Sequence, residues 1–194
     1  MIHKHVLDTA GWYKQRVAAT IIAATMSNTP STRIAKRHSE SGSGVPGTIG
    51  WREWASLPEL GIPAIKVKID TGARTSALHA FKLETFEHDG REYLRFWIHP
   101  LQRKTQIEIV CEAPVLDKRT VKDSGGHAEE RYVIKTPVRI GDRQWEIELT
   151  LTSREDMLFR MLLGRSAIVD GGLTVDPDKS FLHGRKSRKI YKTR

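Results

Sequence analysis

One short stretch of the sequence, Asp70-Thr71-Gly72, has residue types that could activate a water molecule. Asp70 offers a carboxylate and Thr71 a hydroxyl, and Gly72 lets another backbone approach closely. If two such aspartates face each other, they share one proton, because two carboxylates that close cannot both be ionised. The ionised one can then act as a general base on a water molecule between them. Taken alone, the tripeptide is also typical of an ordinary turn.

The residues before Asp70 predict a strand that delivers its carboxylate to this turn. In residues 65–69, β-branched apolar side chains alternate with lysines. Val67 and Ile69 are therefore expected to face one side of a sheet, and Lys66 and Lys68 the other.

The charge of the chain divides it into a body and two basic ends. The 194 residues carry a formal net charge of +9. Residues 1–45 have six Lys or Arg against two acids, residues 185–194 have six and no acid, and the segment between has 20 bases and 21 acids. Because the excess lies in the ends, we expect no nucleic-acid partner for the body. Weak binding of RNA or anionic lipid by the ends remains a lesser alternative.

Composition predicts three segments. Residues 1–47 are expected to be a flexible extension or linker, residues 48–184 a domain, and residues 185–194 a basic tail. The apolar run at 17–26 is ten residues long, which is too short to span a bilayer. We therefore expect a cytoplasmic protein without a membrane partner. Export or anchoring through residues 14–30 is the weaker alternative.

Many short strands joined by Gly, Asp and Pro turns predict an all-β fold, either a closed barrel or a folded sheet. The clearest strand is residues 144–151, where Trp145, Ile147, Leu149 and Leu151 are expected to face the core. A short helix is expected after Gly164, ending at a turn in Asp170-Gly171-Gly172. Further strands are expected at 49–54, 81–87, 93–98, 106–110, 113–116, 131–140, 173–175 and 180–182.

Three features in a fixed order resemble the retropepsin-type aspartic peptidases. They are Asp70-Thr71-Gly72-Ala73 after an apolar strand, a polar loop with Ser124-Gly125-Gly126 before two strands, and Leu162-Leu163-Gly164-Arg165. The resemblance is closer to one bacterial family that carries the historical name "ATP-dependent zinc protease" and is linked with ATP-grasp ligases of the RimK type. It covers about residues 48–184 and includes Ile49-Gly50-Trp51-Arg52-Glu53.

The resemblance implies an aspartic endopeptidase that hydrolyses peptide or protein substrates. Each chain has one Asp-Thr-Gly, so a catalytic pair requires a homodimer with Asp70 from both subunits. Thr71, Gly72, Ala73, Leu162, Leu163, Gly164 and Arg165 would support the active-site loop. Ser124, Gly125 and Gly126 would form the flap over a bound peptide. A RimK-type ligase is an implied partner.

The zinc and ATP in the historical name have no matching motif in the sequence. A His-Glu-x-x-His zinc motif and a Gly-x-x-x-x-Gly-Lys-Ser/Thr phosphate loop are both absent. The eight histidines show no ligand spacing in the body of the chain. We therefore predict no metal site and no cofactor.

Several alternatives remain open at this point. Asp123-Ser124-Gly125 could supply a second aspartate, although a flap turn is favoured, since no β-branched strand precedes it. His79 is expected to be a packed or surface histidine and Cys111 a packed core thiol, and neither is expected to be catalytic. A non-catalytic module that binds a peptide or partner in the same fold is the alternative to a peptidase.

Overall fold

The computed structural model describes residues 47–102, 104–122, 126, 128–153, 158–186 and 188–191. They belong to one compact unit, Ser43–Arg194. The predicted N-terminal extension and its apolar run lie outside the described residues, apart from Gly47. No helix in the described ranges is long and apolar enough to cross a membrane.

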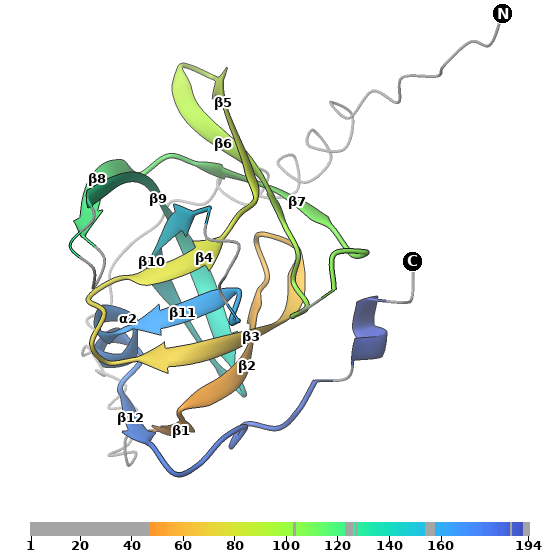
Figure 1. Cartoon of the computed structure of the whole chain (residues 1–194), viewed down its shortest axis with the longest axis vertical. Helices are drawn as coiled ribbons and strands as arrows, with labels where there is room; N and C mark the ends of the chain where they lie inside the picture. Colours follow the sequence, from red (N-terminus) through yellow and green to blue (C-terminus); the bar gives the residue numbers. More distant parts are fainter. Residues whose placement is uncertain are drawn as a thin grey trace, which may run out of the picture. The chain divides into compact units, whose positions relative to one another are not determined.

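The largest sheet closes into a ring (Figure 1). Its seven strands lie in the order β10-β4-β11-β3-β2-β9-β8, and β10 also pairs with β9. The strands are β2 (Arg52–Leu57), β3 (Ile62–Asp70), β4 (Ser76–His79), β8 (Asp117–Lys122), β9 (Ala128–Ile140), β10 (Arg143–Thr152) and β11 (Met161–Gly164). The expected all-β class is confirmed.

Two smaller sheets and short helices complete the unit. Strands β5 (Lys82–His88), β6 (Arg91–Ile98) and β7 (Ile109–Pro114) form an antiparallel sheet. Strand β1 (Gly47–Gly50) pairs in parallel with β12 (Leu173–Asp176). The helix α2 (Arg165–Asp170) follows Gly164 directly, as predicted, and η1 (Arg188–Tyr191) is a short 3₁₀ helix.

The main core cluster is formed by strands of the ring together with β6 and β7, and strand β10 shows how the sequence builds it. Ile147, Leu149 and Leu151 are buried as predicted, while Trp145 is half-buried and donates its Nε1–H to the carbonyl of Ala167 at 2.9 Å. Alternation along a strand places one set of side chains on each face. Because β10 lies between β9 and β4, its alternation fixes the inner face of the ring.

Some strand predictions were wrong in extent or existence. The two strands expected at 106–110 and 113–116 are one strand, β7, which ends at Pro114 because proline has no N–H for the ladder. The strand expected at 49–54 is interrupted at Trp51. Residues 180–182 form no strand, since Phe181 has a φ of 59°, which breaks an extended backbone.

Candidate active site

Asp70 is the last residue of β3, and β11 lies beside it. The two strands pair in parallel, so that Gly164 is opposite Asp70 and Leu163 is opposite Ile69. The two motifs that the resemblance singled out are therefore neighbours in the structure, although about ninety residues separate them in the sequence.

The alternation predicted for the strand before Asp70 is observed in β3. Val67 and Ile69 are buried, whereas Lys68 is exposed and Lys66 half-buried. The apolar face of β3 thus anchors the strand in the core while its end carries Asp70 to the surface.

The carboxylate of Asp70 is held by the loop that it begins. Its Oδ1 accepts the N–H of Gly72 at 3.1 Å and the N–H of Ala73 at 3.2 Å. This is the local hydrogen bonding by which aspartate stabilises a turn. Asp70 is half-buried, and Thr71 and Gly72 are exposed. The loop therefore presents a positioned carboxylate at the surface of the single chain.

Arg165 and Ser166, at the beginning of α2, brace this loop from the other side. Arg165 N–H donates to the carbonyl of Ala73 at 2.8 Å, and Ser166 N–H donates to the carbonyl of Arg74 at 3.0 Å. The Arg165 guanidinium reaches the carbonyl of Thr71 at 3.2 Å. The beginning of α2 therefore fixes the backbone of the loop that follows Asp70.

Gly164, which precedes α2, adds a contact to the end of the same loop. Its N–H donates to Ser76 Oγ at 3.1 Å. Ser76 is buried and begins β4, the strand that follows the loop. The loop is therefore held at both of its ends as well as along its backbone.

Replacing Gly164 with alanine is expected to disturb this arrangement. A Cβ there would lie 2.4 Å from the carbonyl carbon of Thr75 and 2.5 Å from its oxygen, both backbone atoms. Overpacking of this kind costs about 1–3 kcal/mol of folding free energy. Thermal unfolding should show this loss for Gly164→Ala. Gly61→Ala tests backbone strain alone, since Gly61 has a φ of 68° but no described neighbour within 4 Å of an added Cβ. A Gly164→Ala protein as stable as wild type would contradict the close approach.

The candidate flap is the hairpin of β8 and β9. These strands pair from Asp117 opposite Val133 to Lys122 opposite Ala128. Gly126 lies in the turn between them, is exposed, and has a φ of 84°. Ser124 and Gly125 lie outside the described residues, and so does Asp123, the rival second aspartate. The described part of the loop is thus the connection of a hairpin.

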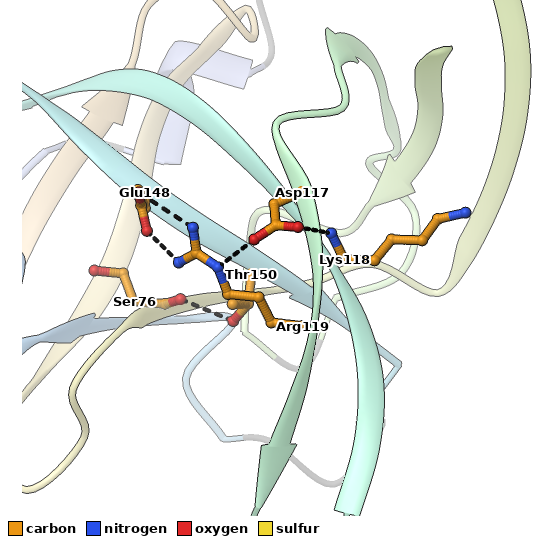
Figure 2. A network of polar contacts seen from close by, with 6 residues as sticks. All are labelled: Ser76, Asp117, Lys118, Arg119, Glu148 and Thr150. Carbon is orange, nitrogen blue, oxygen red and sulfur yellow. Dashed lines mark hydrogen bonds and ion pairs between the residues drawn. The ribbon is translucent and has the colours of Figure 1, made fainter.

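A polar network fixes the base of this hairpin to the ring, as Figure 2 shows. Arg119 on β8 donates to Glu148 on β10, with one of its two contacts at 3.4 Å, and to Asp117 Oδ2 at 2.7 Å. Thr150, also on β10, donates to the carbonyl of Ser76 on β4 at 2.9 Å. Ser76 Oγ also accepts the N–H of Gly164, the residue before α2. Strands β10 and β4, which pair with each other, therefore connect the flap base with the Asp70 loop.

The network also shifts the acidity of its carboxyl groups. Hydrogen bonds from Arg119 lower the pKa of both Glu148 and Asp117, and the N–H of Lys118 lowers the pKa of Asp117 further. A lowered carboxyl pKa stabilises the fold above the ordinary pKa, and this contribution disappears as the pH falls through the lowered value. The flap base is therefore expected to loosen only in acid.

The other candidate groups are packed or structural. Cys111 is buried, and burial raises the pKa of its thiol to about 12, which agrees with a core thiol. His79 is also buried, at 2% exposure. Asp170 ends α2 before Gly171 and Gly172, as predicted. Among the described residues, no group of three or more His, Cys, Asp or Glu side chains could hold a metal ion.

Comparison with known proteins identifies the family. The family described as "Retropepsin-like aspartic endopeptidase RimB" matches residues 48–186. A solved structure of a Legionella pneumophila protein of unknown function has a TM-score of 0.61 and 30% identity, and the match covers 72% of this chain and 99% of that one.

Two similar curated proteins are named probable alpha-L-glutamate ligases. The one from Desulfotalea psychrophila is 48% identical over 141 residues, which cover 73% of this chain. The one from Shewanella pealeana is 46% identical over 138 residues, which cover 71% of this chain. In both comparisons the matched part spans only 30% of the ligase. With its braced Asp-Thr-Gly loop and closed β-sheet, the chain belongs to the RimB-like family of retropepsin-like aspartic endopeptidases.

Proposed function

We propose that the chain is an aspartic endopeptidase that works as a homodimer. The observation that carries this proposal is the Asp70 loop, whose carboxylate is positioned by two N–H groups and whose backbone is braced by Gly164 and Arg165. One chain supplies one such loop. A symmetric dimer would bring two Asp70 side chains to the two-fold axis.

The two aspartates would divide the chemistry between them. Like charges at this distance leave one Asp70 ionised and one protonated. The ionised Asp70 would take a proton from the water molecule while the water oxygen attacks the peptide carbonyl carbon. The protonated one would donate a hydrogen bond to the carbonyl oxygen. The C–N bond of the tetrahedral intermediate would then break, and the proton taken from water would pass from the first Asp70 to the leaving amine nitrogen. Thr71 is exposed beside Asp70 and would contact the partner loop.

The names of the relatives suggest the substrate. Their name refers to ligation of alpha-L-glutamate, and part of each of these relatives is similar to this chain. We propose that the peptidase cleaves peptides that carry α-linked glutamate and that a RimK-type ligase is its functional partner. The extended substrate would lie as an added strand beneath the β8–β9 hairpin.

The proposal is tested by incubating the full chain with glutamate-rich and neutral peptides from about pH 3 to about pH 7, a range that suits a carboxylate pair. Oligomeric state is measured in the same samples. Cleavage by a dimer that a chelator does not reduce supports the proposal. A dimer without cleavage of any peptide, or activity that requires a metal, would refute it.

The second candidate function is a non-catalytic module that binds a peptide or a ligase. The observation that favours it is the single Asp-Thr-Gly of the chain, because a monomer has half of the required pair. A monomer that binds peptide without cleaving it, and that binds equally well after Asp70→Asn, is the result expected of such a module.

Arg119→Ala is expected to weaken peptide binding more than it slows the chemical step. Removal of Arg119 frees β8 from Glu148 on β10 and also removes the partner of Asp117 within β8, so the flap base becomes mobile while the Asp70 loop keeps its own hydrogen bonds. We expect KM to rise several-fold with kcat changed less, as measured by steady-state kinetics. Arg95→Ala is the matched control, since Arg95 pairs with Glu112 on the separate three-stranded sheet at 2.6 Å. Equal effects of the two substitutions would contradict a role for the flap base.

A further inference from the structure

Lys68 and Arg52 are among the cationic side chains on the sheet face of Asp70. Lys68 precedes Asp70 by two positions on β3, so both side chains point to the same side. Arg52 on β2 is directly opposite Lys68, and Leu162 on β11 is opposite Lys68 on the other side. Paired residues of adjacent strands share a face. Arg52, Lys68 and Leu162 therefore form one row across three strands, beside Asp70.

The two cations of this row have no carboxylate partner among the described residues. Within the described part of the chain, neither Arg52 nor Lys68 forms an ion pair, and the Nε of Arg52 is buried without a hydrogen-bond partner. Lys82, Arg95 and Arg119, in contrast, pair with carboxylates. Like charges directly opposite each other destabilise a sheet. The pair therefore costs stability, which an anionic ligand would restore.

Aromatic rings hold Arg52 in place. Its guanidinium carbon lies 4.4 Å from the centre of the Trp51 ring and 4.9 Å from that of Phe181. Stacking of this kind fixes the plane of the guanidinium, whose terminal N–H groups can bind a carboxylate. Lys68 is exposed and Leu162 is half-buried. The row thus combines one oriented cation, one solvent-exposed cation and an apolar neighbour.

The position of the row fits a peptide lying across Asp70. Two residues along a strand are about 6.6–6.8 Å apart, which is also the spacing of successive same-side residues in an extended substrate. A substrate side chain next to the scissile bond would therefore reach the row while the bond itself lies at Asp70.

We propose that Lys68 and Arg52 form a carboxylate-binding subsite that selects an acidic side chain next to the scissile bond. This inference rests on the proposed peptidase function and names the residues that determine its specificity. Arg52 can bind a carboxylate through two N–H groups, and Lys68 adds a point charge. The uncharged amide of glutamine in the same peptide position would lose most of this interaction.

The test compares kcat/KM for two peptides that differ only in Glu or Gln beside the cleaved bond. The full-length dimer is used as wild type, Lys68→Gln and Lys82→Gln. Lys82 is the matched control, because it is an exposed lysine on β5, outside the main sheet. We expect wild type and Lys82→Gln to prefer the Glu peptide at least tenfold, or about 1.4 kcal/mol. Lys68→Gln should lose most of this preference, because its kcat/KM for the Glu peptide falls toward that for the Gln peptide.

Two further measurements separate the subsite from a loss of structure. Lys68→Glu should favour a peptide with Lys at that position, which an unfolded or damaged protein could not do. Raising the salt concentration should reduce the preference of wild type for Glu, since Lys68 is exposed to solvent. If wild type cleaves both peptides but Lys68→Gln keeps the full preference for Glu, the proposed subsite is contradicted while the proposed peptidase function is supported. If wild type cleaves neither, the proposed function itself fails.

Discussion

Replacing Asp70 with asparagine is expected to abolish peptide cleavage and leave the fold intact. An asparagine can keep its Oδ1 in place as acceptor for the N–H groups of Gly72 and Ala73, which hold the present carboxylate at 3.1 and 3.2 Å. It cannot accept a proton from water. Loss of general acid–base catalysis costs about 10²–10⁴-fold in rate. Assays of kcat/KM, with thermal unfolding of the same samples, measure both parts of this prediction.

Asp170→Asn is the matched control for this substitution. Asp170 is likewise followed by a turn with glycine, but it is exposed and lies at the opposite end of α2 from Arg165, which braces the Asp70 loop. Its replacement should leave cleavage unchanged. Cleavage at the wild-type rate by Asp70→Asn would contradict the aspartic mechanism.

Mixing wild type with Asp70→Asn tests whether both subunits supply a catalytic group. When equal amounts of the two proteins exchange subunits at random, about half as many dimers consist of two wild-type subunits as before mixing. If both aspartates are needed, total activity falls to about half of its value before mixing. Unchanged total activity would mean that each chain acts alone and would contradict the shared site.

The elements around Asp70 were visible in the sequence because they are local motifs in a fixed order. The alternating strand before Asp70 and the helix directly after Gly164 were both predicted and are both observed. The close contact of Gly164 with Thr75 gives a physical reason for a glycine at that position. Short-range patterns of this kind are visible in a single sequence.

The contacts that the sequence did not reveal depend on register between distant strands. Arg119 meets Glu148 across β9, and Arg52 meets Lys68 across a hairpin. Alternation identifies which side chains share a face of one strand but not which residue of another strand lies opposite. The strand expected at 180–182 was wrong for a similar reason. Its apolar residue Phe181 packs against the distant β2–β3 face, but as part of an irregular segment.

The C-terminal segment explains why Glu53 is buried, and this leads to the largest expected effect on stability. The Glu53 side chain is fully buried on β2. Its Oε1 accepts the N–H of Gly50 at 2.8 Å and of Leu182 at 2.9 Å, and its Oε2 accepts the N–H of His183 at 3.4 Å. A buried carboxylate is tolerated only when such partners satisfy it. Glu53 therefore ties residues 182–183 to the corner between β1 and β2.

Glu53→Ala is expected to lower the free energy of unfolding by about 2–5 kcal/mol, because each orphaned buried N–H costs about 1–3 kcal/mol. The melting temperature should fall by about 2–4 °C for each kcal/mol. Glu53→Gln, which retains one acceptor oxygen, should lose less, and Glu59→Ala, at an exposed glutamate in the β2–β3 turn, should lose almost nothing. A Glu53→Ala protein as stable as Glu59→Ala would contradict this account.

Since Phe181 stacks on Arg52, release of the segment should also weaken the preference for an acidic side chain, and the Glu53→Ala dimer can be assayed for this with the same peptide pair.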